Sequence, residues 1–114
     1  MLWTNPSPTS NFAEQIVTIS SDMNSFKYLK FVFKYSKSNN TEMSAIYTVD
    51  DFKTFAIGVG YACGAVVYRP AGTNIVRRIA YSSDTSIRIS GTKAIDASSS
   101  DDSLLIPLAI YGMN

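Results

Sequence analysis

The chain has 114 residues, of which 46% are hydrophobic and 17% are charged. This length and apolar content are enough for one domain, residues 1–114, with one continuous core, and a second domain is not expected. Ten basic residues stand against nine acidic ones, so no net field recruits nucleic acid, anionic lipid or an acidic substrate.

Two residue types that carry much of protein chemistry are scarce. Cys63 is the single cysteine and histidine is absent. The chain can therefore form no internal disulfide, no Ser-His or Cys-His catalytic pair, and few of the familiar zinc and iron sites. No apolar run reaches membrane-spanning length, and the N-terminal residues lack the pattern of a secretory signal. We predict no cofactor, no metal and no membrane insertion.

The N-terminal segment, residues 1–13, holds Pro6 and Pro8 among turn-forming residues. We expect it to run extended over the surface, anchored by Trp3, without joining a β-ladder. Residues 15–20 alternate apolar and polar side chains, which predicts the first strand.

The clearest strand of the chain is at residues 26–35, FKYLKFVFKY. One set of alternating side chains is apolar: Leu29, Phe31, Phe33 and Tyr35. The other set is mixed: Tyr28, Lys30, Val32 and Lys34. This two-residue period predicts a strand with one packed face and one partly wet face, as in an antiparallel sheet.

The middle of the chain continues the β pattern. Residues 42–49 alternate as a strand, Asp50 and Asp51 are assigned to a turn, and residues 52–58 are assigned to a further strand. Glycines punctuate the apolar stretch from residue 58 to 68, which favours a bend over a phosphate-binding loop. No amphipathic helix is expected.

Strands are also predicted at residues 75–81 and 85–90. Residues 91–103 are the longest polar stretch and are interpreted as a mobile loop. The chain then ends in a strand at 104–111 that we expect to be covered on both faces. Because Pro107 cannot donate a backbone hydrogen bond, it should lie at a bulge or face away from a partner strand.

About eight short strands separated by turns predict an all-β fold, an antiparallel β-sandwich or jelly roll. Within it, Arg77 and Arg78 are adjacent on one strand and should point to opposite faces of the sheet. They therefore make no basic patch, and we expect each to be solvated or ion-paired.

Carboxylates fall mainly in predicted turns: Asp50, Asp51, Asp84, Asp96, Asp101 and Asp102. They lack the spacing of a calcium loop, and aspartate is common in turns because its side chain caps nearby amides. A glycosidase would need two carboxyls facing one sugar bond, and the sequence cannot place such a pair. We predict a protein without catalytic residues, and a small polysaccharide-degrading enzyme stays open as an alternative.

The chain has seven tyrosines and one tryptophan, which provide flat surfaces for stacking against sugar rings, although tyrosine also packs at interfaces. The candidate ligand-binding residues are Trp3, Tyr61, Tyr68 and Tyr81. The candidate subunit-interface residues are Tyr28, Lys30, Val32 and Lys34. A neighbouring subunit would bury the aromatic and aliphatic members of this second set while the lysines extend their charged ends to the rim.

Residues 2–10, LWTNPSPTS, followed by the segment at 12–15, and residues 106–112, IPLAIYG, resemble the two ends of a terminal β-domain in structural proteins of phages and prophages of Gram-positive bacteria. These are tail-fibre, head-fibre or minor structural proteins. The middle of the chain matches only in its strand-and-turn character. The resemblance brings no enzymatic motif and assigns no functional residue.

This resemblance implies a non-catalytic domain on the exterior of a phage particle, at the tip of a homotrimeric fibre. Such a domain contacts a host-surface glycan or protein during host attachment. Two alternatives stay open: a purely structural fibre or head-decoration domain, and a freestanding carbohydrate-binding or adhesion module of a secreted bacterial protein.

Overall fold

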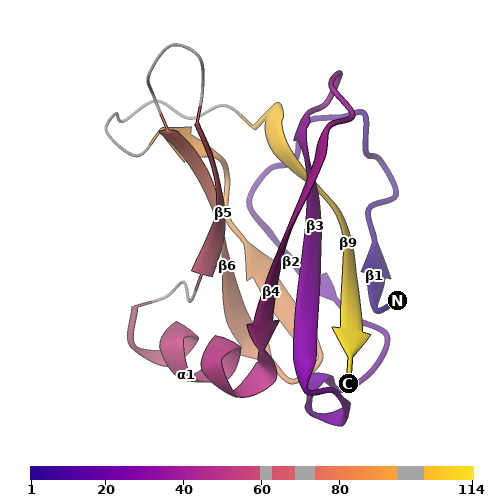
Figure 1. The fold of residues 1–114 in the computed structure, drawn as a ribbon, viewed down its shortest axis with the longest axis vertical. Helices are drawn as coiled ribbons and strands as arrows, with labels where there is room; N and C mark the ends of the chain where they lie inside the picture. Colours follow the sequence, from indigo (N-terminus) through magenta and orange to yellow (C-terminus); the bar gives the residue numbers. More distant parts are fainter. Residues whose placement is uncertain (60–62, 69–73, 95–101) are drawn as a thin grey trace.

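The computed structural model describes the backbone of residues 1–59, 63–68, 74–94 and 102–114, and the side chains of residues 1–54, 75–92 and 102–114. Over these residues the chain forms two antiparallel sheets packed face to face, with one α-helix at the lower end (Figure 1). The predicted all-β fold class is confirmed. The described strands number nine, and two of them are only two residues long.

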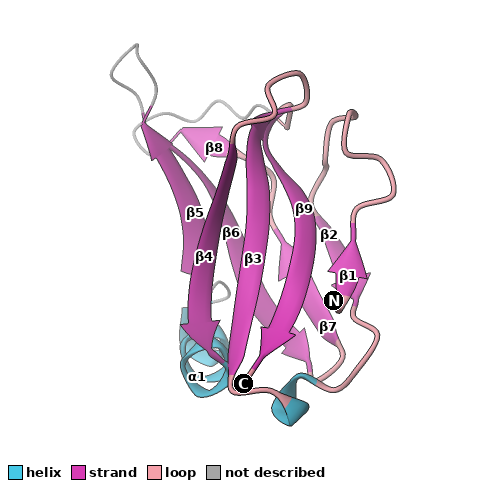
Figure 2. Cartoon of the chain, turned by 45° about the vertical axis from the view of Figure 1, so that its right-hand side comes forward, coloured by secondary structure: helices cyan, strands magenta, loops and turns pink. Residues whose placement is uncertain are grey.

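The two layers are seen one in front of the other in Figure 2. Sheet A contains, in spatial order, β1 (Trp3–Thr4), β9 (Leu104–Met113), β3 (Tyr28–Ser36) and β4 (Glu42–Thr48). Sheet B contains β2 (Gln15–Thr18), β7 (Ser86–Ile89), β6 (Asn74–Ser83) and β5 (Cys63–Tyr68), with β8 (Lys93–Ala94) also paired to β6. A short 3-10 helix, η1 (Met23–Ser25), lies between β2 and β3.

Strand β3 is one of the two inner strands of sheet A, and its predicted alternation is confirmed from Tyr28 to Phe33. Leu29, Phe31 and Phe33 are buried and face sheet B. Phe31 pairs with Ile110 of β9 on one side and with Ala45 of β4 on the other. Fully burying one such apolar side chain is worth about 1.5–3 kcal/mol, so this row of side chains is a main support of the sandwich.

The predicted position of Pro107 is also confirmed. The pairing of β3 with β9 shifts between Val32, which pairs with Ala109, and Phe33, which pairs with Pro107. One residue of β9, Leu108, is therefore left over, as in a β-bulge. The proline lies where the ladder is already interrupted, so its missing N–H costs no additional hydrogen bond.

The prediction that the N-terminal segment joins no ladder is wrong. Trp3 and Thr4 pair with Ile110 and Ala109 at the edge of β9, and the side chain of Phe12 is buried. A strand edge offers a row of unpaired backbone groups, and a short extended segment satisfies part of it. The two prolines do not prevent this pairing because they lie beyond it.

The assignment of residues 50 and 51 to a turn and of 52–58 to a strand is also wrong. These residues belong to the α-helix α1 (Val49–Val59). The Thr48 hydroxyl accepts a hydrogen bond from the Asp51 amide at 3.1 Å, which caps the helix. The two aspartates lie in the first turn, where negative charge is favoured by the helix dipole.

The helix closes the lower end of the sandwich (Figure 1). Phe52 is buried, and its ring lies 5.6 Å from that of Phe31, centroid to centroid. The signal for this helix was present in the sequence. A Thr followed three residues later by an Asp is a capping pattern, and Val49 and Phe52 share the three-residue spacing of one helix face. The 11-residue helix is too short to cross a membrane, and the described residues include no longer one.

The polar stretch at 91–103 is not a loop throughout. Lys93 and Ala94 pair with Val76 and Ile75 of β6, and the Thr92 side chain is buried. Residues 95–101 lie outside the described part of the chain, so the predicted mobility of that part is not tested.

Candidate functional site

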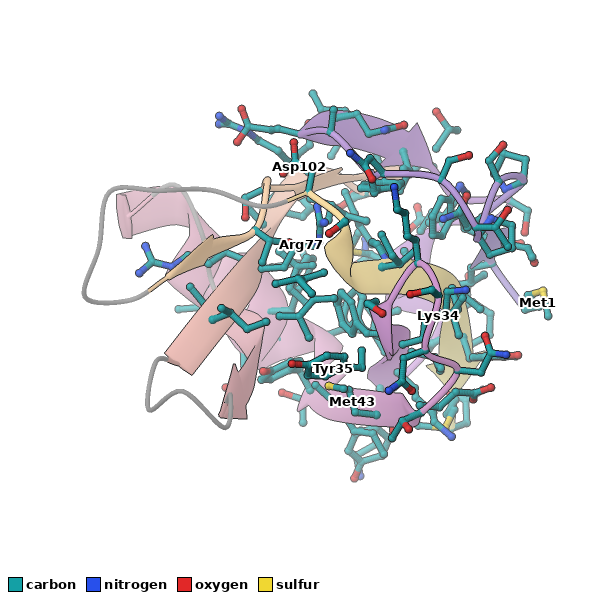
Figure 3. All side chains as sticks on the ribbon, turned by 90° about the horizontal axis from the view of Figure 1, so that it is seen from above. Met1, Lys34, Tyr35, Met43, Arg77 and Asp102 are labelled. Atoms are coloured by element: carbon teal, nitrogen blue, oxygen red, sulfur yellow. The ribbon has the colours of Figure 1, made fainter. Side chains whose placement is uncertain are left out.

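Arg77 lies at the centre of the most extensive hydrogen-bond network in the described structure. It projects from β6 between the two sheets, toward the start of β9 and beside Asp102 (Figure 3). Its side chain is 0% exposed. The expectation of a solvated or ion-paired Arg77 is therefore wrong, whereas Arg78, the next residue, is exposed as expected.

All the guanidinium N–H groups of Arg77 donate to backbone carbonyl oxygens, an arrangement that we call the Arg77 cage. Nε donates to Leu105 at 2.7 Å, and Nη1 donates to Phe12 and Ser90, both at 2.8 Å. Nη2 donates to Leu104 at 2.9 Å and to Asp102 at 3.3 Å. Arginine has five N–H donors, so none is left unpaired.

Burial disfavours the charged form of Arg77 and lowers the pKa of its guanidinium to about 10, while the negative charge of Asp102 partly offsets this shift. Arg77 therefore stays protonated at neutral pH. The Phe12 ring adds a cation–π contact, with the Arg77 Cζ 5.3 Å from the ring centroid. A buried cation is tolerated because carbonyl dipoles replace its hydration shell.

The cage joins three segments that are distant in sequence. Its acceptors come from the N-terminal segment, from the end of β7 and from the start of β9. Leu105 has a φ of 48°, in the left-handed region that costs a non-glycine residue about 1–3 kcal/mol. The Arg77 bonds to Leu104 and Leu105 hold this backbone in place, and the Thr92 hydroxyl adds a further bond to Leu104 at 2.7 Å.

Phe12 connects the Arg77 cage to Trp3. The two rings meet edge to face, with centroids 6.1 Å apart and an interplanar angle of 77°. Beside them lies a groove of about 370 Å³ between the N-terminal segment and β2, which we call the Trp3 groove. Its described lining is uncharged: Trp3, Asn5, Pro6, Ser7, Asn11, Phe12, Gln15, Ile16 and Val17.

The polar groups of the Trp3 groove divide into structural ones and free ones. The buried Asn5 amide donates to the Pro107 carbonyl and its oxygen accepts from the Ser7 amide, both at 2.8 Å, so Asn5 shapes the loop. Gln15 donates to the Ala13 carbonyl at 3.1 Å, and no described residue donates a hydrogen bond to its amide oxygen. Among the described residues nothing pairs with the Trp3 indole N–H or the exposed Asn11 amide.

The other aromatic candidates do not join Trp3 in this groove. Tyr81 lies in a separate polar cluster, the Tyr68 side chain is outside the described part, and so is Tyr61. Sequence reasoning did not find Phe12, Asn11 or Gln15 as neighbours of Trp3. Their proximity depends on the path of the N-terminal segment around the sheet edge, for which the sequence had no periodic signal.

The Tyr81 cluster, which we call the Asp84 latch, joins α1 to the turn between β6 and β7. The Tyr81 hydroxyl donates to Asp84 Oδ1 at 2.7 Å, and Lys53 Nζ lies 3.2 Å from the same oxygen. Lys53 also donates to Asn24 Oδ1 at 2.8 Å and lies 5.5 Å from the centroid of the Tyr81 ring. The polar groups of the latch are therefore paired with one another, and the Lys53 ammonium group lies over the face of the Tyr81 ring.

Charge and hydrogen bonding shift the pKa values of both Asp84 and Tyr81 in the latch. The Tyr81 hydroxyl, more than Lys53 or Asn24, lowers the pKa of Asp84, since each of them stabilises the carboxylate. The same hydrogen bond raises the pKa of Tyr81, because the phenolate would face a carboxylate. The latch is thus an exposed, mutually neutralised cluster that fastens two elements together.

The interface candidates lie on the outer face of sheet A. Tyr28, Lys30 and Val32 are half-buried there. Lys34 differs from the prediction, because its side chain is only 4% exposed. Its ammonium group donates to the Lys37 carbonyl at 3.2 Å and to the side-chain oxygen of Asn40 at 3.4 Å, so the hairpin after β3 covers it.

Within the described part of the chain, no three His, Cys, Asp or Glu side chains lie close enough together to hold a metal ion. Asp84 lies in a turn as predicted, and Asp102 lies beside the Arg77 cage. Asp96 and Asp101 lie outside the described residues.

Comparison of the chain with family models, with curated proteins and with solved structures gives no match. The fold and the groove therefore define its class: a two-sheet all-β domain with an uncharged groove of aromatic and amide side chains at one edge. The phage resemblance of its two ends stays a prediction.

Proposed function

We propose that this chain is a non-catalytic binding domain on the exterior of a phage particle, at the tip of a homo-oligomeric fibre, where its Trp3 groove attaches to a host-surface glycan. The observation that carries the glycan contact is the composition of the groove. A half-buried indole lies beside side-chain amides that are available to a ligand.

This composition suits a sugar because a pyranose ring has an apolar C–H face and a rim of hydroxyls. The indole offers a flat apolar surface with an N–H at its edge, and Asn11 and Gln15 offer both donors and acceptors for hydroxyls. The groove volume of about 370 Å³ falls within the usual range for small-ligand sites. The uncharged lining favours neutral sugars over phosphate-rich polymers.

Binding without catalysis is supported by the same lining. Glycoside hydrolysis commonly uses two carboxyl groups placed across the scissile bond. The described residues that line the groove carry no carboxylate. A ligand seated there would meet groups that orient it and none that would protonate its glycosidic oxygen.

The proposal is tested by intrinsic fluorescence, since Trp3 is the only tryptophan of the chain. Titration with purified neutral cell-wall polysaccharide from Gram-positive bacteria should shift or quench the emission in a saturable way. Gln15→Ala should weaken binding about 5- to 30-fold through a lost hydrogen bond of 1–2 kcal/mol. Thr18→Ala, on the same strand but outside the groove, is the matched control and should bind as the unmodified chain does.

Two results would overturn the glycan assignment: no change in Trp3 emission across a panel of such polysaccharides, or equal binding by the Gln15 and Thr18 variants. Far-ultraviolet circular dichroism of each variant checks that the fold is retained.

A freestanding carbohydrate-binding module of a secreted bacterial protein is the second candidate. The observation that favours it is that the lining of the groove comes from one short segment, residues 3–17, which a small module can present without a fibre. Antibody labelling separates the two proposals. Labelled virions in purified phage preparations would support the fibre domain, and label only in the culture medium would support the secreted module.

A further inference from the structure

The outer face of sheet A carries three cross-strand rows of side chains. The registers of β3 with β9 and β4 define them. The rows are Tyr111, Lys30 and Ile46; Ala109, Val32 and Ser44; and Ile106, Lys34 and Glu42. The members from β3 and β4 alternate with inward-facing residues, so they point away from the core. Ile106, Lys34 and Ala109 are covered, with exposures of 0%, 4% and 7%. The open part of the face is therefore formed by Tyr111, Lys30, Ile46, Val32, Ser44 and Glu42.

Several apolar side chains lie on this face, although the outer face of a solvated sheet is usually polar. Ile46 is 55% exposed, one of few large hydrophobic side chains so exposed in the described chain. A shallow groove of about 370 Å³ runs over the face, with Val32 and Ser44 between Lys30 and Glu42. Tyr111 and Met113 line its other side. Tyrosine and methionine are enriched at protein interfaces relative to other surfaces.

The charges on this face are complementary to each other. Lys30 lies one row from Val32 toward one end of the strands, and Glu42 lies one row from it toward the other end. Neither side chain has an ion-pair or hydrogen-bond partner among the residues that the structure describes. Lys34, the remaining charge of these rows, is covered by its own hairpin.

We propose that a second copy of this chain occupies the face, related by a two-fold axis that lies in the plane of the face and crosses the Val32–Ser44 pair. Lys30 and Glu42 lie on opposite sides of this pair, so the axis brings Lys30 of each copy opposite Glu42 of the other. The two charge contacts are equivalent, as an isologous interface requires. Between them Val32 packs against its own equivalent, and Ile46 is removed from water.

A second copy fits better than an unrelated partner because the patch is complementary to itself, in charge and in apolar surface. Among the described residues it carries one cation and one anion without partners, together with an apolar floor. The chain has a formal net charge of only +1, so copies are not repelled at long range. This pairing uses none of the residues of the Trp3 groove. It therefore stands or fails independently of the proposed glycan binding. It joins the copies in pairs, in place of the homotrimer that the phage resemblance implies.

The test is the mass of the chain by sedimentation equilibrium over a range of concentrations, at low and high salt. We expect a dimer that weakens as salt screens the two charge contacts. Val32→Glu and Lys30→Glu should each raise the dissociation constant about tenfold or more, since like charges face each other across the axis. Arg78→Glu makes the same change as Lys30→Glu on the outer face of sheet B and should leave the dimer unchanged.

Reversing the two charges tests the contact between Lys30 and Glu42 directly. Lys30→Glu alone and Glu42→Lys alone should each be monomeric at concentrations where the unmodified chain is dimeric. An equimolar mixture of these two variants should form a heterodimer, because both contacts then join opposite charges. A monomer at all concentrations, a trimer, or a mixture that stays monomeric would overturn the two-fold interface.

Discussion

The two ends of the sandwich hold polar clusters that differ in their environment. At one end the Arg77 cage places a fully buried cation among five backbone carbonyl oxygens. At the other end the Asp84 latch joins Lys53, Tyr81 and Asn24 to a carboxylate in contact with solvent. Both clusters tie together segments far apart in the chain.

This difference shows that burial, more than the number of contacts, sets how much a polar cluster contributes to the stability of the fold. If the latch is broken, water solvates each freed group, so the loss is small. If the Arg77 side chain is removed, water cannot easily reach the carbonyls that it satisfied. Each unsatisfied buried acceptor costs about 1–3 kcal/mol. We therefore expect the cage to decide whether the domain folds, and the latch to adjust its response to pH.

The largest effect is expected for Arg77→Met, which keeps much of the side-chain volume and removes every donor. We expect a loss of at least 3–5 kcal/mol in the free energy of unfolding, measured by urea denaturation. Arg78→Met changes the neighbouring, exposed arginine and should stay within about 0.5 kcal/mol of the unmodified chain. Equal stabilities of the two variants would contradict the structural role of the cage.

Asp102→Asn should have an intermediate effect. The Asp102 side chain accepts a hydrogen bond from the Thr92 amide at 3.2 Å, and asparagine retains an acceptor there. What is lost is the negative charge that partly offsets the lowered pKa of Arg77. We expect a loss of about 1 kcal/mol in the same urea experiment. A loss as large as that of Arg77→Met would show that ion pairing, not the carbonyl cage, stabilises the buried cation.

The smallest effect is expected at the latch and appears as a dependence on pH. The pKa of Asp84 is lowered below its ordinary value of 3.8, so its contribution is present above that pH and is lost as the pH falls through the folded-state pKa. The pKa of Tyr81 is raised above 10.0, so its contribution is complete below pH 10.0 and is lost as the pH rises through the folded-state value.

Thermal unfolding from pH 2 to 11 measures both limits. Asp84→Asn should remove part of the decline in melting temperature on the acid side, and Tyr81→Phe should remove part of it on the alkaline side. Because the cluster is exposed, both changes should shrink in high salt. Profiles that match those of the unmodified chain would show that the hydrogen bond between Tyr81 and Asp84 contributes nothing to stability.

Much of the β architecture could be predicted from local pattern. The strand at residues 26–35, its inward and outward sets, and the bulge at Pro107 follow from side-chain alternation and from the missing N–H of proline. Helix α1 was missed because its apolar residues also fit a two-residue period, and the Thr48 cap was the signal that separates the two readings. Arg77 was misjudged although it occupies an inward position between Ile75 and Ile79, a pattern that indicates a buried charge.

The candidate site could be predicted only in part. Trp3 was identified as an aromatic contact residue, but Asn11 and Gln15 became its neighbours only through the path of the N-terminal segment. That path depends on the hydrogen bond between Arg77 and the Phe12 carbonyl and on the pairing of Trp3 with Ile110. Neither contact has a local signature.

By itself the sequence determined most of the longer strands and which of their faces are apolar, because a pleated backbone alternates side chains over every two residues. It also excluded histidine chemistry and internal disulfides, because the residues are lacking. Tertiary structure alone decided that Arg77 is buried and that the Trp3 groove forms. A buried cation needs several acceptors at once, and these come from segments near residues 12, 90 and 104 that meet only when the two sheets pack together.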